Sequence, residues 1–449
     1  MRRTLRSSRV RNVVLPVVTL TMGALLLSAC SGGSSSASGS SPSTTKAGEK
    51  VELNFWSWAP DMDKTVDVWN TSHPNIHVTV NKQDGGDPAV TKLLTAIKAK
   101  SGAPDLMQAE YQAIPTMVAA GALADIKKDL DPALQSKFAP GVWNSVTLGT
   151  DAVYAVPQDS GPMVFYYRTD VFKKYHLSVP TTWDEYAATA RTLHQKNKKL
   201  YLGTFSATDP GWFVGLTQQN GASWWGIDGQ KWSVSIDSPQ SQKVADYWGG
   251  LVQEGVIDNS PMYTPSWNAA LNKGTQVGWL SAVWAPGVLA GNAANTKGKW
   301  EVAPLPQWTA GASATGNWGG SSTAVTTQSK HPAEAAQFAA WINTDPAGVK
   351  ALATISNVYP ADKAESAAVL TSPPAFFANQ PDFYDVVAKV ADTAGKFTYG
   401  PNVNVAYSAY NDAFGKAAQA KTKTAFTQAL TTMQTLTLKN LQDSGYGTK

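Results

Sequence analysis

Cysteine and histidine, two side chains that often hold metals, are scarce in this 449-residue chain, which has one cysteine and five histidines. A single cysteine cannot form a disulfide within the chain, and it leaves no cysteine-rich metal site. His73 and His77 are close in sequence, but Pro74 lies between them, so they do not form a helical metal-binding pair. The sequence therefore predicts neither a metal nor another cofactor.

Signature motifs of common enzyme classes are also missing. The chain has no phosphate-binding loop, no nucleophile elbow and no metalloprotease signature. Asp61 with Asp63, and Asp382 with Asp385, are pairs of nearby carboxylates, but sequence alone cannot supply the separation that a glycosidase needs. We interpret both pairs as solvated charges or helix caps, and we expect binding in place of catalysis.

An excess of charge of either sign is nearly absent. Lysine and arginine number 37 against 33 acidic residues, but five of the arginines lie within residues 2–11, a segment without acids. Without those five, 32 basic residues face 33 acidic ones. A near-neutral chain lacks the basic surface of a nucleic-acid-binding protein, so we exclude nucleic acid as a partner.

The N-terminal 29 residues have the three parts of an export signal. An arginine-rich start is followed by an apolar run over residues 13–27 and by Leu27-Ser28-Ala29-Cys30. That tetrapeptide matches the bacterial lipobox, whose cysteine is lipidated and becomes the mature N-terminus. We therefore expect a signal peptide over residues 1–29 and lipidation of Cys30, which would hold the protein on the outer face of the cytoplasmic membrane. The alternative is a transmembrane anchor, because the apolar run approaches spanning length.

Beyond Cys30 the composition separates a spacer from a folded region. Residues 30–50 are rich in Ser, Gly, Thr and Ala and nearly free of large apolar residues, which predicts a flexible linker. The folded region from residue 51 onward is too long for one ordinary core, so we expect two lobes. Strand and helix patterns alternate from residue 51, which predicts a mainly parallel sheet, and a capping box at Thr182 opens a helix in a second lobe.

Residues 151–168, DAVYAVPQDSGPMVFYYR, consist of two extended apolar stretches joined by a rigid polar turn. Pro157 and Pro162 restrict φ and Gly161 permits unusual φ, so Asp159 would be held at a defined point. We interpret the segment as a hinge between two bodies. An ordinary surface hairpin is the alternative.

Tryptophan is abundant, and its placement is informative. The chain has 17 tryptophans. Helical periodicity explains Trp69, Trp183, Trp248 and Trp341 as core residues. Another group lies next to glycine or proline outside clean helical patterns, namely Trp58, Trp212, Trp284 and Trp318. A flat indole face with a hydrogen-bond donor suits a sugar ring, although pinning of a loop would explain the same positions.

Several short motifs recur in an order and spacing that resemble the extracellular solute-binding proteins (family 1) of sugar ABC transporters. Besides the segment around Asp159, they are Phe55-Trp56-Ser57-Trp58, Ala103-Pro104-Asp105-Leu106-Met107, Gly121-Ala122-Leu123-Ala124-Asp125, Pro180-Thr181-Thr182-Trp183-Asp184-Glu185, Trp318-Gly319-Gly320-Ser321-Ser322 and Lys330-His331-Pro332-Ala333-Glu334-Ala335. Together they extend the resemblance over essentially all of residues 51–449.

The resemblance implies an α/β, two-lobed periplasmic-binding-protein fold of type II, with hinged lobes and a ligand cleft between them. Its N-terminal lobe would comprise residues 51–157 and 306–345, and its C-terminal lobe residues 158–305 and 346–449. Carried over by position, the cleft would be lined by Trp58, Glu110, Tyr111, Asp159, Trp212, Trp284, Trp318, Gly319 and Tyr410. Tyr410 departs from the tryptophan of maltose-binding relatives, which leaves the geometry of that subsite open.

The function implied is capture of a mono- or oligosaccharide by lobe closure and its delivery to the permease subunits of an ABC importer. We expect a monomer that makes and breaks no bond. Two alternatives remain open: a secreted glycoside hydrolase, which would consume an oligosaccharide, and a structural cell-surface lipoprotein, whose melting temperature no sugar would shift. Neither the sugar nor the partner permease follows from the sequence.

Overall fold

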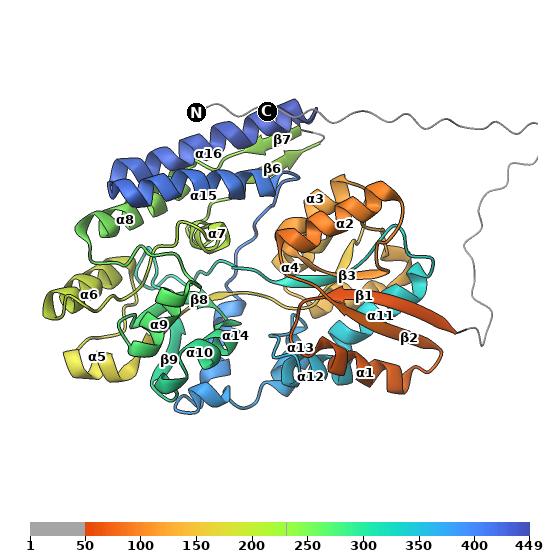
Figure 1. Ribbon diagram of the computed structural model, residues 1–449, viewed down its shortest axis with the longest axis horizontal. Helices are drawn as coiled ribbons and strands as arrows, with labels where there is room; N and C mark the ends of the chain where they lie inside the picture. The colour runs from red at the N-terminus through yellow and green to blue at the C-terminus, as the bar shows by residue number, and fades with distance from the viewer. Residues whose placement is uncertain (1–49, 230) are drawn as a thin grey trace, which may run out of the picture. The chain divides into compact units, whose positions relative to one another are not determined.

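The structure is a computed structural model that describes residues 50–229 and 231–449 (Figure 1). The predicted signal peptide, the lipidation site at Cys30 and the linker up to residue 49 lie outside the described residues. None of the helices in the described ranges has the length and apolar character needed to cross a bilayer.

The first sheet carries the strand and helix alternation predicted for the first lobe. Its strands follow the order β2 (Ile76–Lys82), β1 (Val51–Ser57), β3 (Leu106–Glu110), β10 (Ser321–Val325) and β4 (Ala155–Pro157). β1 pairs in parallel with β2 and β3, which confirms the parallel sheet at this point. β10 returns from far along the chain and pairs antiparallel with both β3 and β4.

Helices join and cover the strands of the first sheet, and their sequence patterns explain where they form. Met62, Val66 and Trp69 are buried on one face of the first helix, as the helical spacing predicted. Proline in the first turn of the helix that follows His331 suits a position where no intrahelical N–H bond is needed. The helices of this part are α1 (Met62–Ser72), α2 (Asp87–Ala99), α3 (Ile114–Ala119), α4 (Pro140–Thr147), α11 (Pro332–Thr344), α12 (Pro346–Thr354) and α13 (Lys363–Val369).

The second sheet differs from the parallel arrangement of β1 to β3. Its central strand β5 (Met163–Arg168) pairs antiparallel with both β8 (Gly278–Ala282) and β9 (Trp300–Pro304). A small separate sheet has the order β11 (Gly447–Thr448), β7 (Lys231–Val234) and β6 (Trp225–Asp228). Because β8 and β9 lie more than a hundred residues beyond β5, the local pattern could not reveal the antiparallel pairing of the second sheet.

A mostly helical layer surrounds the second sheet. The predicted capping box is present: the Thr182 hydroxyl accepts the N–H of Glu185, and the Glu185 carboxylate accepts the N–H of Thr182. Of the long C-terminal helices, α16 (Lys423–Asp443) packs against both α15 (Val403–Ala420) and α8 (Pro239–Glu254), and Figure 1 shows α15 and α16 together. The helices of this part are α5 (Thr169–Tyr175), α6 (Trp183–Lys196), α7 (Pro210–Gln219), α8 (Pro239–Glu254), α9 (Pro265–Lys273), α10 (Ala285–Asn292), α14 (Phe383–Ala391), α15 (Val403–Ala420) and α16 (Lys423–Asp443).

Two separate hydrophobic cores lie around the two main sheets. The chain leaves the first core after Val156 and enters the second at Met163. It returns between Trp318, in the second core, and Ala324, in the first, and it crosses again after Ala361. Where the lobe boundaries should be drawn along these segments stays a prediction.

Three segments pair with one another where the chain passes between the cores, and we call them the junction segments: residues 157–162, 316–321 and 358–361. Asp159 forms a β-bridge with Pro360, and Pro162 forms one with Asn317. β4 belongs to the first sheet and β5 to the second, so the alternative of an ordinary hairpin is wrong. Gly161 has no positive φ, contrary to expectation. It is needed for space, because a Cβ there would lie 2.2 Å from the carbonyl oxygen of Trp318.

Candidate functional site

The charges of two carboxylates from other parts of the chain, Asp159 and Asp209, act on Glu110, and we call these three residues the carboxylate cluster. Glu110 ends β3, Asp159 lies in the first junction segment and Asp209 begins α7. Burial contributes most to raising the pKa of Glu110, and the negative charges of Asp159, Asp87 and Asp209 raise it further, to about 7. A cluster of this kind favours partners that donate hydrogen bonds and disfavours anions.

Asp209 is held by the start of a helix and by an aromatic ring. Its carboxylate accepts the backbone N–H of Trp212 at 3.2 Å, as an N-cap does, and it also bonds with the side chain of Trp318. Gly211 allows this approach, because a Cβ there would lie 3.0 Å from Cδ1 of Trp318. Burial raises the pKa of Asp209 to about 7 despite both hydrogen bonds.

Asp159 joins two of the junction segments to the end of β3. Its carboxylate accepts the backbone N–H of Ser321, and its carbonyl oxygen accepts the hydroxyl of Tyr111 at 2.7 Å. Burial raises the pKa of Asp159 to about 6, although the bonds from Ser321 oppose the rise. Tyr111 thus orients the Asp159 backbone, and its own ring is buried.

Two of the predicted tryptophans meet edge to face. The ring centroids of Trp284 and Trp318 are 4.8 Å apart, and the Trp284 indole N–H donates to the Trp318 carbonyl at 2.9 Å. Trp284 is half-buried, and it lines a cavity of about 280 Å³ together with Val358 and Phe376. Gly319 has φ +75, and a Cβ there would lie 3.5 Å from Nε1 of Trp284.

Trp58 is half-buried at the end of β1. A Cβ on Gly85 would lie 3.2 Å from its ring, so the absence of a side chain at residue 85 leaves the ring room. A Cβ on Gly86 would lie 3.8 Å from the Glu110 carboxylate. The loop before α2 therefore brings Trp58 and Glu110 to the same end of the first sheet.

Trp212 and Tyr410 lie fully inside the second core. The Trp212 indole donates to the carbonyl of Leu280 at 3.1 Å, and the Tyr410 hydroxyl donates to the carbonyl of Ser206 at 2.8 Å. Their polar atoms are satisfied and their rings are covered by other aromatic residues. This packing favours a core role for both, and their role as ligand contacts stays a prediction.

Four further residues join the predicted ones, namely Asp209, Tyr263, Tyr399 and Tyr407. The negative charges of Glu110 and Asp209 act on Tyr407, whose side chain bonds with that of Tyr399. Tyr263 is 42% exposed, and its ring lies 6.3 Å from that of Trp318. The only local signal was the Asp-Pro-Gly-Trp helix start at residue 209, because the tyrosines approach the cluster through tertiary packing.

The two acidic pairs noted in the sequence lie at the starts of helices α1 and α14. Asp61 pairs with Lys64 at 2.7 Å on the exposed start of α1, as expected for a solvated charge. Asp382 and Asp385 lie at the start of α14. Within residues 50–229 and 231–449, no group of three or more His, Cys, Asp or Glu side chains is arranged to hold a metal ion.

Comparison with known proteins places these features in a family. Residues 56–349 match the bacterial extracellular solute-binding protein family. The arabinooligosaccharide-binding protein of Halalkalibacterium halodurans is 24% identical over 303 residues, which cover 65% of this chain and 67% of that protein. The lactose-binding protein of Rhizobium radiobacter is 26% identical over 313 residues, which cover 64% and 69%.

Solved structures are similar over most of the chain. The galacto-N-biose and lacto-N-biose I-binding protein of the ABC transporter from Bifidobacterium longum, in complex with lacto-N-biose, is 27% identical. The match has a TM-score of 0.79 and covers 90% of this chain and all of that one. An ABC transporter associated binding protein from B. animalis subsp. lactis, in complex with β-1,6-galactobiose, is 26% identical with a TM-score of 0.77, and covers 89% of this chain and all of that one.

Proposed function

The chain belongs to the bacterial extracellular solute-binding protein family, whose two-lobed fold it shares, and we propose that it captures a neutral oligosaccharide and delivers it to the permease of an ABC importer. The relatives named above bind sugars, which supports this ligand class. Family members are transporter binding proteins, and we propose likewise that this chain releases its ligand unchanged.

The proposal rests on one observation: hydrogen-bond acceptors and aromatic rings from both cores come together at the junction segments. Glu110 comes from the first sheet, Asp209 from the second core, and Asp159 from the segment that joins them. Sugar hydroxyls donate hydrogen bonds to carboxylates, and the C–H faces of sugar rings pack on indoles. Closure of the lobes on a ligand held between them would follow as a population shift toward the closed state.

We assign the proposed contacts according to what each side chain exposes. Glu110, Asp159 and Asp209 would accept hydroxyls, while Trp58 and Trp284 would offer ring faces. Tyr111 and Trp318 would position Asp159 and Asp209, and Gly319 would keep space beside Trp284.

The decisive experiment is isothermal titration calorimetry with a panel of arabino-oligosaccharides, lactose, lacto-N-biose and β-1,6-galactobiose. We expect saturable one-to-one binding of at least one neutral oligosaccharide. At about pH 8, above the raised pKa of Glu110, Glu110→Ala should weaken it by up to about a hundredfold, the equivalent of a lost hydrogen bond to a charged group. Exposed Glu52→Ala serves as the control. Chromatography should return the sugar intact, whereas shortened products would support a hydrolase.

For the location, we propose a lipid anchor at Cys30, which lies outside the described residues. Cys30→Ala should release the protein from the membrane fraction, because the linker offers no other apolar anchor. Fractionation of cells expressing either form tests this. A mutant that is processed at the same rate as wild type and still stays in the membrane fraction would contradict the anchor and leave the sugar-binding proposal untouched.

A further inference from the structure

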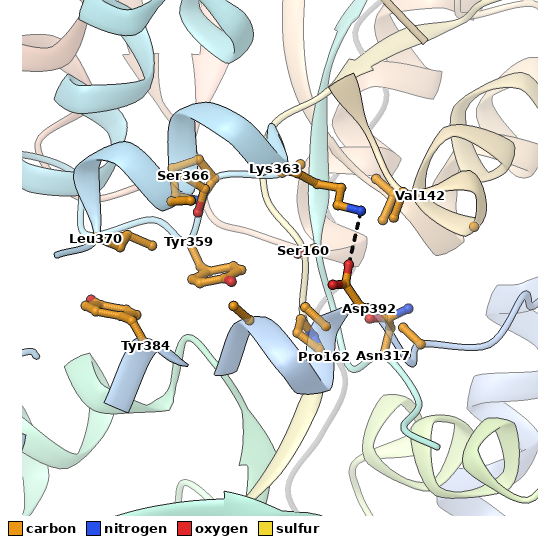
Figure 2. Close-up of a pocket in the computed structure, with 18 of the residues that line it drawn as sticks. Val142, Ser160, Pro162, Asn317, Tyr359, Lys363, Ser366, Leu370, Tyr384 and Asp392 are labelled. Carbon is orange, nitrogen blue, oxygen red and sulfur yellow. Dashed lines mark ion pairs between the residues drawn. The ribbon is translucent and has the colours of Figure 1, made fainter. Parts of the chain in front are cut away.

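A cavity of about 310 Å³ lies beside the junction segments, and we call it the junction cavity. Its walls come from α4, from Ser160, Pro162, Asn317 and residues 359–361, and from helices α13 and α14 (Figure 2). No member of the carboxylate cluster lines it. Its volume falls within the range of small-molecule sites, which begins at about 300 Å³.

One end of the junction cavity is mainly aromatic and apolar, although Asp385, the residue after Tyr384, also lines the cavity. Figure 2 shows Tyr359, Tyr384 and Leu370 together at this end. Both tyrosine rings are half-buried, and the hydroxyl of Tyr359 bonds with the side chain of Ser366. Alanines of α13 and α14 line the walls between the larger side chains. This end suits a flat aromatic ring, because aromatic pairs gain from edge or offset contacts beyond the area that they bury.

The other end carries opposite charges and an acceptor without a partner. Lys363 and Asp392 form an ion pair of 3.1 Å there, as Figure 2 shows. Their side chains are 55% and 63% exposed, so separating them costs little. Oδ1 of Asn317 is buried and accepts no hydrogen bond within the described residues. A buried acceptor of this kind is stabilised by a ligand that brings an N–H or O–H donor.

We propose that the junction cavity binds an aromatic α-amino acid as its zwitterion. The ring would lie against Tyr359 and Tyr384, and the α-carboxylate would bond with Lys363. The α-ammonium group would bond with Asp392 and with Oδ1 of Asn317. A neutral aromatic molecule would make no ionic contact with Lys363 and Asp392. A small zwitterion without a ring would leave the tyrosine end empty.

Occupation of the junction cavity would also influence closure, and this consequence rests on the proposed function. Val142 on α4 belongs to the first core, and α14 contributes Phe383, Val387 and Val390 to the second. A ligand that contacts α4 and α14 at once binds one relative position of the two cores better than others. Such a ligand then changes the affinity of the protein for the sugar, and the sugar changes the affinity for this ligand by the same factor.

The test is calorimetry with L-phenylalanine on the full chain without sugar, so its outcome does not depend on the proposed sugar binding. We expect saturable one-to-one binding, with phenol and glycine each at least about tenfold weaker, because each lacks one half of the contacts. Lys363→Gln should weaken L-phenylalanine about fivefold or more. Lys389→Gln, an exposed substitution on α14 that does not line the cavity, should leave it unchanged.

A filling variant locates the site. Ala367→Phe places a ring in the cavity, whereas Ala368→Phe changes the next exposed residue of α13, which does not line it. We expect binding to be lost in the first variant and kept in the second. If Ala367→Phe lowers the melting temperature, Ala388→Phe on α14 replaces it. Absence of saturable binding to wild type, binding equal to wild type in the filled variants, or equal affinity for phenol would each overturn the proposal.

Discussion

At the scale of single residues, the half-buried Glu110 should make stability depend on pH. Its pKa is raised from 4.5 to about 7, so the folded chain keeps a proton that the unfolded chain releases. The contribution of Glu110 to stability is therefore complete below its unfolded pKa and is lost as the pH rises through about 7. Between about pH 4 and pH 8, we expect the free energy of unfolding to fall less in Glu110→Gln than in wild type, by on the order of 2 kcal/mol.

Urea unfolding at both pH values measures this difference. Glu52→Gln removes an exposed carboxylate from β1 and should keep the pH dependence of wild type. A Glu110→Gln variant with the same dependence as wild type would show that the Glu110 carboxyl does not keep its proton in the folded chain.

Replacement of two single tryptophans, Trp212 and Trp284, by alanine should have opposite effects on stability and sugar affinity. Trp212 is 1% exposed, and its indole bonds with the Leu280 carbonyl, so Trp212→Ala should cost about 3–5 kcal/mol of folding stability. Trp284 is half-buried beside a cavity, so Trp284→Ala should cost sugar affinity more than stability. Chemical unfolding and calorimetry on both variants separate these effects. Unchanged sugar affinity in Trp284→Ala would remove that ring from the site.

At the scale of elements, the rotation of α15 about its axis decides whether Tyr407 or Tyr410 can contact a ligand. The Tyr410 hydroxyl is buried on the carbonyl of Ser206, so Tyr410→Phe should cost about 0.5–1.5 kcal/mol of stability with little change in sugar affinity. Tyr407 is half-buried and the charge of Glu110 acts on it, so Tyr407→Phe should reduce sugar affinity by about twofold to tenfold. Melting curves and calorimetry test the pair, and the reverse pattern would place Tyr410 in the site.

At the scale of the whole molecule, the close approach of the junction segments joins the two cores. A Cβ on Gly161 would lie 2.2 Å from a backbone oxygen, which cannot move aside as a flexible side chain would, so Gly161→Ala should lower stability and sugar affinity together. Gly415 lies on α15 with nothing within 4 Å of its Cβ position, so Gly415→Ala should stabilise by about 0.5–1 kcal/mol. Thermal melts and calorimetry compare them. A Gly161→Ala variant that behaves like Gly415→Ala would contradict this role of the junction.

The sequence by itself determined the elements whose signals are local. Helical spacing placed Met62 and Trp69 on the buried face of α1, the capping box at Thr182 began α6, and the Pro-Gln-Asp-Ser-Gly-Pro turn put Asp159 between two bodies. Each of these follows from residues within a few positions of one another, which is the range over which backbone preferences and side-chain caps act.

Only the tertiary structure decided the antiparallel second sheet, the burial of Trp212 and Tyr410, and the contact of Asp209 with Trp318. Tyr410 and Ser206 are 204 residues apart, so no local pattern could show that this ring turns into the core. Glycine and proline beside a tryptophan predict a loop but not the direction of the ring, because packing against distant side chains sets that direction. The carboxylate cluster likewise depends on tertiary structure, because Glu110 at the end of β3, Asp159 in a junction segment and Asp209 at the start of α7 are far apart in the sequence.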